Sequence, residues 1–283
     1  MSPRPLTALG LKWNPFSPEV PIEALWVSPR VDHFLWRVER QVREGGFALI
    51  TGEPGTGKSV TLRILADRLA KMRDVSVGIL THPRSRMADF YREMGELFGT
   101  TITACNRWGG FKALREKWLT HIDATLTRPV LLIDEAQSVY PEVLTELRLL
   151  ASTHFDSRAI LTVVLAGDQR LPELFRTEEL LPLGSRMRVR LAHESASHEE
   201  LLACLNHRMD QAGHAQLMTP ALAQTLCEHA LGNYRVLCTI AGELLDAALA
   251  KDLRTLDEKL YLEVFAPAAS RKTTPGSAKA VRR

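Results

Sequence analysis

The sequence predicts an α/β protein in which a mostly parallel sheet flanked by helices is followed by a small helical domain. Up to residue 194, short apolar runs alternate with amphipathic stretches, which is typical of parallel strands joined by crossover helices. After that point the remaining periodic stretches have helical spacing. The 283 residues are 45% hydrophobic and 24% charged, which is the balance of a globular protein with a sizeable core.

The expected strands are apolar runs bounded by turn residues, and the last of the five alternates apolar and charged residues. They lie at 47–51, 75–80, 130–133, 160–166 and 187–191. Helices are expected at 31–43, 60–71, 87–98, 111–126 and 141–150, and then at 197–212, 220–230, 234–250 and 257–264. Ser197 and Glu200 have the spacing of a capping box.

This pattern divides the chain into four expected segments. They are a Pro-rich extended arm at 1–30, the α/β domain at 31–194, the helical domain at 195–265 and a basic, disordered tail at 266–283. The formal charge of the whole chain is +3, and the tail holds five bases and no acid. The basic excess is therefore a property of the tail, which we expect to tether a partner or to attract DNA.

Composition also excludes several classes of protein. No apolar run approaches the roughly 20 residues that cross a bilayer, and the N-terminus lacks the apolar core of a signal peptide. We therefore expect a cytoplasmic protein without a membrane partner. Four cysteines stand singly, with no CxxC pair, and we expect them to be reduced and not to bind metal.

A phosphate-binding loop follows the first expected strand. Gly52-Glu-Pro-Gly55-Thr-Gly57-Lys58-Ser59 fits the P-loop pattern and precedes a helix, as that pattern requires. Its glycines allow successive backbone N–H groups and the helix N-terminus to face the phosphates of a nucleotide. Lys58 is expected to reach the β and γ phosphates, and Ser59 to bind Mg²⁺. The predicted nucleotide contacts are Gly52, Glu53, Pro54, Gly55, Thr56, Gly57, Lys58, Ser59 and Val60.

Two carboxylates follow the third expected strand, at the edge of a parallel sheet where ligands bind. Asp134 is expected to bind Mg²⁺ together with Ser59. Glu135 is expected to polarise the attacking water, a task that needs a carboxylate besides the metal ligand. Together with the P-loop, this pair predicts an enzyme that hydrolyses ATP with Mg²⁺.

The motifs resemble those of the AAA+ ATPases, and within them the ExeA-like group with its transposition relatives IstB, TniB, TnsC and MuB. The resemblance covers roughly residues 11–265. It rests on Asn14-Pro-Phe16, Trp26-Val-Ser-Pro29, the P-loop, Leu132-Ile-Asp-Glu-Ala-Gln137, Val164-Leu-Ala-Gly167, Gly184-Ser-Arg186 and Gly232-Asn-Tyr-Arg235.

The resemblance implies roles for further residues. Arg186 occupies the place of an arginine finger that acts on the neighbouring subunit's nucleotide, and Arg235 that of a sensor on the lid helix touching the γ phosphate. After the fourth strand, relatives commonly place a neutral polar residue, whereas this chain has Asp168 followed by Gln169. Either Asp168 orients the water or Gln169 takes that role. Phe16, Trp26 and Val31 are candidates for contacting adenine or, alternatively, for pinning the arm to the core.

Three hypotheses describe what the ATPase acts on. The first is a regulator of DNA transposition that assembles with ATP as a ring or helical filament on double-stranded DNA, independently of sequence, and recruits a transposase or target-selection adaptor. The second is an ExeA-like secretion accessory ATPase, and the third is a protein-binding NTPase switch. The resemblance implies that a secretion member would carry a transmembrane helix and a peptidoglycan-binding region after its ATPase domain, and the chain's end soon after the lid favours the first hypothesis.

The charge pattern mildly favours DNA as the partner. Between Arg84 and Arg128 eight bases face five acids, in the region where the relatives place their DNA-facing loops. Arg107 to Gly110, followed by Lys112, is expected to be the most loop-like part of this region. The predicted DNA contacts are Arg84, Arg86, Arg107 and Lys112, gripping phosphates rather than bases.

Overall fold

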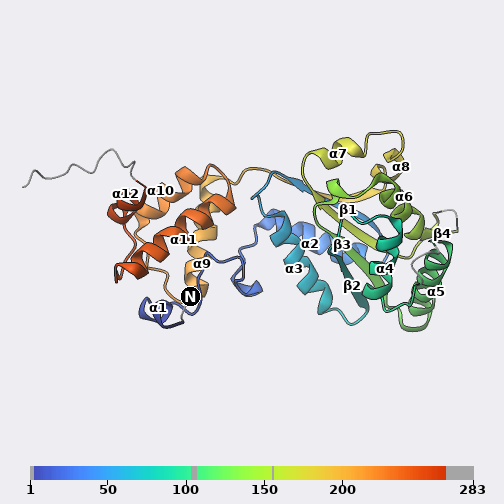
Figure 1. The fold of residues 1–283 in the computed structure, drawn as a ribbon, viewed down its shortest axis with the longest axis horizontal. Coiled ribbons are helices and arrows are strands. Elements are labelled where there is room, and N and C mark those ends of the chain that lie inside the picture. The colour runs from blue at the N-terminus through green and yellow to red at the C-terminus, as the bar shows by residue number, and fades with distance from the viewer. Residues whose placement is uncertain (1–2, 103–106, 155, 266–283) are drawn as a thin grey trace, which may run out of the picture.

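The computed structural model describes residues 3–102, 107–154 and 156–265, which form two lobes joined by a narrow waist (Figure 1). One lobe holds a five-stranded parallel sheet with the order β2-β3-β6-β1-β7. Its strands are β1 (Gly46–Gly52), β2 (Val75–Leu80), β3 (Arg128–Ile133), β6 (Thr162–Gly167) and β7 (Met187–His193). The expected α/β fold with a C-terminal helical part is confirmed.

Helices cover both faces of the sheet because its strands are apolar on both sides. Alternate residues of one strand enter different cores: Leu131 and Ile133 pack against one set of helices, and Val130 and Leu132 against the other. The first set is α4 (Met87–Leu97), α5 (Arg107–Thr125) and α6 (Pro141–Leu150). The second set is α2 (Pro29–Gln41) and α3 (Lys58–Ala70).

Short elements complete this lobe. A two-stranded antiparallel ribbon pairs β4 (Ser152–Thr153) with β5 (Arg158–Ala159), and two short helices precede β7. These helices are α7 (Arg170–Leu174) and α8 (Leu181–Gly184), and single 3₁₀ turns lie at η1 (Ile22–Ala24) and η2 (Ala136–Ser138). None of these pieces is long enough to show a periodic apolar pattern in the sequence.

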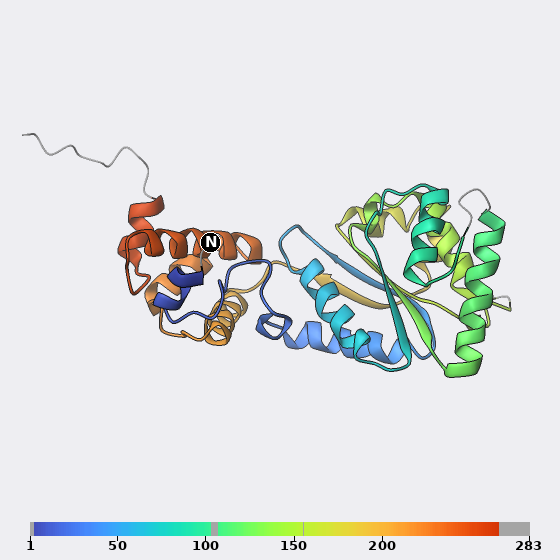
Figure 2. The ribbon, with the colours of Figure 1, turned by 60° about the horizontal axis from the view of Figure 1, so that its bottom comes forward.

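The second lobe is a bundle with its own core. It consists of α9 (His198–Ala212), α10 (Pro220–Ala230), α11 (Tyr234–Ala250) and α12 (Glu258–Phe265). Ser197 accepts a hydrogen bond from the backbone of Glu200, whose side chain bonds back to Ser197 N, so the predicted capping box is present. The view in Figure 2 shows this bundle apart from the sheet, with the N-terminal segment lying against it.

The sequence predicts an extended N-terminal arm, but part of this segment is helical. It begins with α1 (Pro3–Ala8), whose prolines fall in the first turn, where a helix has no backbone partner for their missing N–H groups. Leu9, Leu11 and Phe16 are buried in the core of the helical lobe. Val20 and Leu25 lie in a core of the α/β lobe, so the segment contacts both lobes.

The expectation of a loop at Arg107 to Gly110 is wrong. These residues form the first turn of α5, which continues to Thr125. Gly110 allows α5 to approach α4 closely, since a Cβ there would lie 2.7 Å from Tyr91 Cδ1. Gly110, which had suggested a loop, thus reflects helix packing.

Candidate functional site

The P-loop connects β1 to α3 and presents the N-terminus of that helix. Gly55 and Gly57 have φ values of 86° and 105°, a backbone region that L side chains rarely adopt. Gly57 is the N-cap of α3 and offers no side-chain cap, so the first N–H groups of the helix are left for an anion. Lys58 Nζ donates to Gly52 O at 2.8 Å and to Glu53 O at 3.0 Å, which holds the ammonium over the loop.

The predicted carboxylates lie at the same edge of the sheet. Asp134 and Asp168 directly follow β3 and β6, and β6 pairs with β1 immediately before the P-loop. Glu135 has a left-handed backbone with φ of 51°, and its N–H donates to Asp134 Oδ1 at 2.9 Å. The left-handed conformation of Glu135 is uncommon for a residue with a side chain and is typical of functional sites.

Gln137 ties the catalytic candidates together. Its Nε2 donates to Glu135 Oε2 at 2.6 Å, and its Oε1 accepts from Asp168 N at 3.2 Å. A single amide therefore links the ends of β3 and β6. Gln137 lies in the motif Leu132 to Gln137, whose sequence alone does not indicate this role.

Asp168 is paired with the next basic residue along the chain. Its carboxylate accepts from Arg170 Nε at 2.9 Å and from Arg170 Nη2 at 2.6 Å. The hydrogen bonds to Arg170 hold the pKa of Asp168 below its usual range, and Lys58 contributes in the same direction. The ion pair offsets the negative charge that had made this position unusual for the site.

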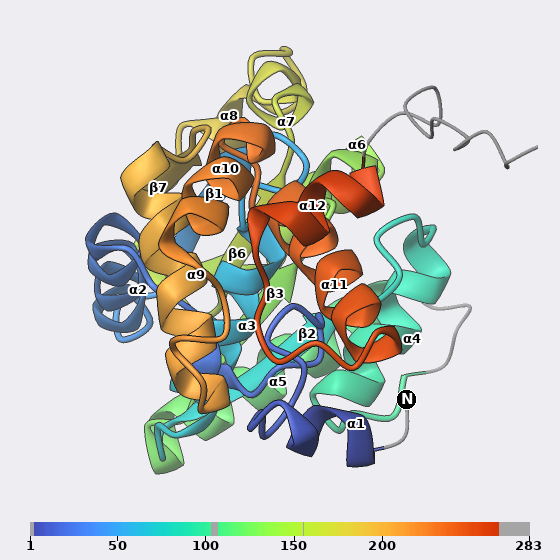
Figure 3. The same ribbon diagram turned by 90° about the vertical axis from the view of Figure 1, so that its left-hand side faces the viewer.

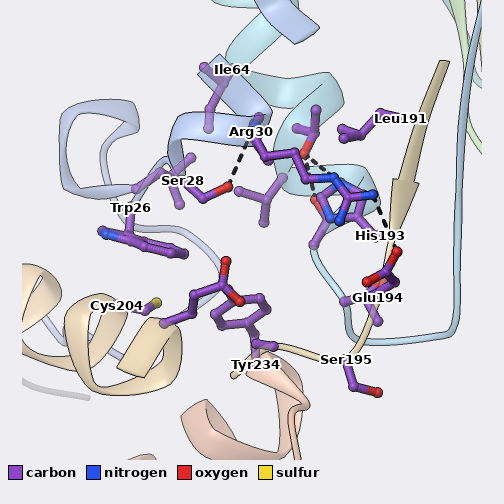
Figure 4. A pocket seen from close by; sticks show the side chains of 18 of the residues that line it. Trp26, Ser28, Arg30, Ile64, Leu191, His193, Glu194, Ser195, Cys204 and Tyr234 are labelled. Atoms are coloured by element: carbon purple, nitrogen blue, oxygen red, sulfur yellow. Dashed lines mark hydrogen bonds and ion pairs between the residues drawn. The ribbon is translucent and has the colours of Figure 1, made fainter. Parts of the chain in front are cut away.

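A pocket lies beside the P-loop, between the two lobes (Figure 4). Trp26 reaches it from the segment before α2, and Tyr234 from the first turn of α11, with ring centroids 6.0 Å apart. Val31, Val60 and Ile64 add apolar surface, which suits the flat face of a base. Phe16, in contrast, is buried in the helical lobe and does not line the pocket.

His193 closes the side of this pocket next to the P-loop. The Thr61 hydroxyl donates to Gly57 O, so His193 Nε2 donates in turn to that hydroxyl at 3.1 Å. Burial lowers the pKa of His193 to about 4, and the positive charges of Lys58 and Arg30 add to this effect. The imidazole is therefore neutral at physiological pH.

The helical lobe touches the P-loop directly. Asn233 Nδ2 donates to Pro54 O at 3.0 Å, while Asn233 Oδ1 caps α11 by accepting from Arg235 N and Val236 N. The two groups are so close that a Cβ at Gly55 would lie 2.1 Å from Asn233 Oδ1. Arg235, the predicted sensor, follows Asn233 by two residues along the chain, and its side chain is exposed.

The residues fit a nucleotide with a divalent cation. The uncapped N-terminus of α3 and the Lys58 ammonium match phosphate oxygens. The Ser59 hydroxyl and the half-buried Asp134 carboxylate are the hard oxygen ligands that Mg²⁺ prefers.

Arg186 lies far from the P-loop of its own chain. It directly precedes β7, and Met187 pairs with Phe47 at the start of β1, whereas the P-loop follows the end of β1. Six residues of strand separate the two levels, or roughly 20 Å. Asp156 of the β4–β5 ribbon forms an ion pair with Arg186, whose side chain is 31% exposed.

The structure separates the four predicted DNA contacts. Arg84 and Arg86 lie in the connection from β2 to α4 and form no ion pair within the described residues, although Arg86 lies over the Tyr140 ring at 5.9 Å. Lys112 pairs with Glu116 on α5 at 3.6 Å. Arg107 donates from Nε and Nη2 to Glu146, which is 2% exposed.

The fold and the site define a P-loop ATPase whose second, helical lobe contacts the nucleotide loop. Residues 40–175 match the family model described as the AAA domain. This part of the chain is therefore similar to the AAA domain, a family that binds nucleotide together with a divalent metal.

Individual proteins are similar over much of the chain. General secretion pathway protein A of Aeromonas hydrophila is 31% identical over 247 residues, which is 86% of this chain and 44% of that protein. The chain thus spans less than half the length of this relative. The structure of Cdc6p from Pyrobaculum aerophilum is similar over 86% of this chain and 67% of the Cdc6p chain, with 16% identity and a TM-score of 0.69. The structure of the Aeropyrum pernix ORC1 protein in complex with DNA is similar over 89% of this chain and 68% of the ORC1 chain, with 16% identity and a TM-score of 0.67.

These similarities support the ATPase class and leave the partner open. The two solved structures, at 16% identity, are similar to this chain in fold alone. Within residues 3–102, 107–154 and 156–265, no helix is long and apolar enough to span a bilayer.

Proposed function

We propose that the protein binds Mg²⁺ and ATP between neighbouring subunits, assembles on double-stranded DNA and regulates transposition by recruiting a transposase or adaptor. The observation that supports this proposal most is an open groove on the surface between β2, α4 and η2. Three arginines and four carboxylates line this groove: Arg84, Arg86 and Arg92, with Asp89, Glu93, Glu96 and the catalytic candidate Glu135. DNA phosphates held by the two arginines would lie near the group that polarises water, which couples DNA binding to hydrolysis.

Each residue of the site has a defined task in hydrolysis. Lys58 and the N-terminus of α3 hold the β and γ phosphates, and Ser59 and Asp134 hold Mg²⁺, whose charge stabilises the phosphate oxygens. Glu135 accepts the proton of the attacking water, and its hydrogen bond from Gln137 fixes the direction of the carboxylate. Of the two alternatives for the sensor after β6, we favour Asp168, because Gln137 links its backbone to Glu135.

Arg186 would complete the site of a neighbouring subunit. Its distance from its own P-loop supports a role in trans, in which the guanidinium stabilises charge on the transferring phosphoryl group. Arg235 would contact the γ phosphate from the helical lobe of the same chain, close to the Asn233 contact with Pro54. Hydrolysis would then require both assembly and a closed helical lobe.

The DNA contact would depend mainly on Arg84 and Arg86. Lys112 and Arg107 already have carboxylate partners, and Arg107 stabilises a buried one. We therefore test the proposal with Arg84→Gln combined with Arg86→Gln, which spares the buried pair. Binding of a fluorescent duplex with a non-hydrolysable ATP analogue should weaken at all sequences tested, while ATP binding stays unchanged. Parent-like DNA affinity in this variant would contradict the proposed contact.

A second candidate function is that of an accessory ATPase for protein secretion. The similarity to general secretion pathway protein A extends over 86% of the chain. This similarity fits a role in secretion at least as well as a role in transposition. The two candidates differ in what stimulates the ATPase. Stimulation of hydrolysis by duplex DNA at low salt supports the transposition proposal, whereas co-fractionation with membranes and no response to DNA supports secretion. A response to neither would favour the protein-binding switch.

A further inference from the structure

A second surface of the α/β lobe is more cationic than the groove beside Glu135. It is an open groove formed by α2, the C-terminal end of α3 and β7, here called the α2 groove. Six basic side chains and two carboxylates line it. They are Arg37, Arg40, Arg43, Arg68, Lys71 and Arg188, with Glu39 and Glu44.

Three of these cations have no carboxylate partner. Arg68 pairs with Asp32 and Glu39, Lys71 with Asp67, and Arg188 with Glu44. In contrast, Arg37, Arg40 and Arg43 form no ion pair with any described residue, and all three are exposed. They recur every three residues, so they extend along one side of α2 and its C-terminal turn for about 9 Å.

An exposed aromatic residue lies among these three arginines on α2. Trp36 is 49% exposed, and the Arg40 guanidinium lies 5.3 Å from its ring centroid. His33 stacks against Trp36 with centroids 5.8 Å apart. A single exposed apolar side chain is common on protein surfaces, so Trp36 adds to this surface mainly through its cation–π contact with Arg40.

The position of the groove sets it apart from the contact proposed above. β7 and β2 are the two opposite edge strands of the sheet, and Arg84 and Arg86 follow β2. Figure 3 shows α2 and α4 on opposite sides of the molecule. One straight duplex seated on the β2 side of a subunit would therefore leave the α2 groove free.

We propose that the α2 groove binds the sugar–phosphate backbone of a nucleic acid, as a second contact distinct from that of Arg84 and Arg86. The three unpaired arginines match about three consecutive phosphates of one strand, at 3.4 Å of helix axis each. Arginine suits this task because its planar fork contacts phosphate through two parallel hydrogen bonds. The open shape of the groove favours a continuous backbone over a small enclosed anion.

The test replaces Arg37, Arg40 and Arg43 together with glutamine in the full chain. A matched control carries Lys251→Gln, Arg254→Gln and Lys259→Gln, which removes the same charge from the helical lobe. Anisotropy titrations with labelled duplex and single-stranded DNA, with an ATP analogue, give affinity at several salt concentrations. The logarithmic salt slope of the α2 variant should be less steep by roughly 2.7, at 0.9 per lost duplex contact, and that of the control unchanged.

Other outcomes would overturn the proposal. Parent-like affinity and slope in the α2 variant, or equal losses in the control, would show that the groove does not bind nucleic acid. The residues 195–265 carry ten acids and five bases, so the helical lobe of a second copy is the alternative occupant. Loss of self-association by the α2 variant without DNA, measured by sedimentation, would identify that occupant instead.

The Arg84→Gln, Arg86→Gln variant separates this proposal from the proposed function. If it binds DNA like the parent while the α2 variant does not, the groove proposal holds and the contact beside Glu135 is wrong. If it alone loses DNA binding, the proposed function holds and the groove proposal is wrong. A parent chain that binds no nucleic acid at low salt contradicts both.

Discussion

Asn233 is predicted to couple the helical lobe to nucleotide binding through two separate contacts. Its Oδ1 caps α11, and its Nδ2 donates to Pro54 in the P-loop. Tyr234, the next residue, lines the pocket together with Thr56 and Gly57 of the P-loop. The change Asn233→Ala removes both contacts. Ser197→Ala is the matched control, because it removes the cap of α9 without touching the P-loop.

The two contacts have different expected sizes. Loss of a helix cap costs about 1 kcal/mol of the free energy of unfolding, and an exposed hydrogen bond between lobes adds about 0.5 kcal/mol. Asn233→Ala should therefore cost about 1.5 kcal/mol, against about 1 kcal/mol for Ser197→Ala, in equilibrium urea unfolding. Only the first change should weaken nucleotide binding, by roughly threefold, because Arg235 and Tyr234 are then less firmly held beside the P-loop.

Titration with a fluorescent ATP analogue measures the second effect. The analogue should bind Ser197→Ala like the parent and Asn233→Ala more weakly. Equal nucleotide affinity in both variants would refute the coupling and would show that Asn233 serves only as the N-cap of α11. A larger loss of stability in the control than in Asn233→Ala would refute the energetic argument.

Three further predictions concern other parts of the structure. Arg186→Ala should leave the nucleotide affinity of the isolated subunit intact and lower hydrolysis in the assembly by roughly a thousandfold, and mixing it with Glu135→Gln should restore part of the activity; no recovery at any ratio contradicts a role in trans. Because burial lowers the pKa of His193 to about 4, against about 6.5 unfolded, the neutral form stabilises the fold above pH 6.5. As the pH falls toward 4 this contribution, about 3 kcal/mol, should be lost, and His193→Gln should flatten that part of the profile in pH-dependent unfolding. Arg107→Gln should destabilise more than Glu146→Gln, since the first leaves a buried carboxylate without its cation; equal melting temperatures would contradict this.

Local motifs were predictable from the sequence because their geometry is set by neighbouring residues. The P-loop, the Asp134-Glu135 pair after β3 and the Ser197 capping box depend on residues within a few positions of the chain. The five strands were also predictable, since each is a buried apolar run bounded by turn residues. Strand order was not, because it is decided by contacts between distant segments.

Long-range contacts account for most of what the sequence did not reveal. Asn233 and Pro54 are 179 positions apart, and although the resemblance placed the neighbouring Arg235 at the γ phosphate, it assigned no contact to Asn233. Likewise, Arg107 forms an ion pair with Glu146 on another helix. The sequence shows that Arg107 is charged, but it does not show that this charge is already paired with a carboxylate. Gly110 misled the assignment because close helix packing and a loop both favour glycine.

The basic tail stays a prediction. Residues 266–283 lie outside the described part of the chain, as does Cys105 among the four cysteines. The proposed tether can be examined by deleting this segment and measuring nucleotide-dependent assembly and transposition separately.

The most direct test of the account is phosphate release by Glu135→Gln at saturating ATP, compared with the parent under conditions of assembly. The glutamine keeps an oxygen that accepts from Gln137, and it leaves Asp134 and Lys58 unchanged, so ATP should bind as in the parent. Without the carboxylate that accepts a proton from water, the rate should fall at least roughly a hundredfold. Turnover at the parent rate, with ATP bound, would contradict the assignment of Glu135 and with it the proposed site.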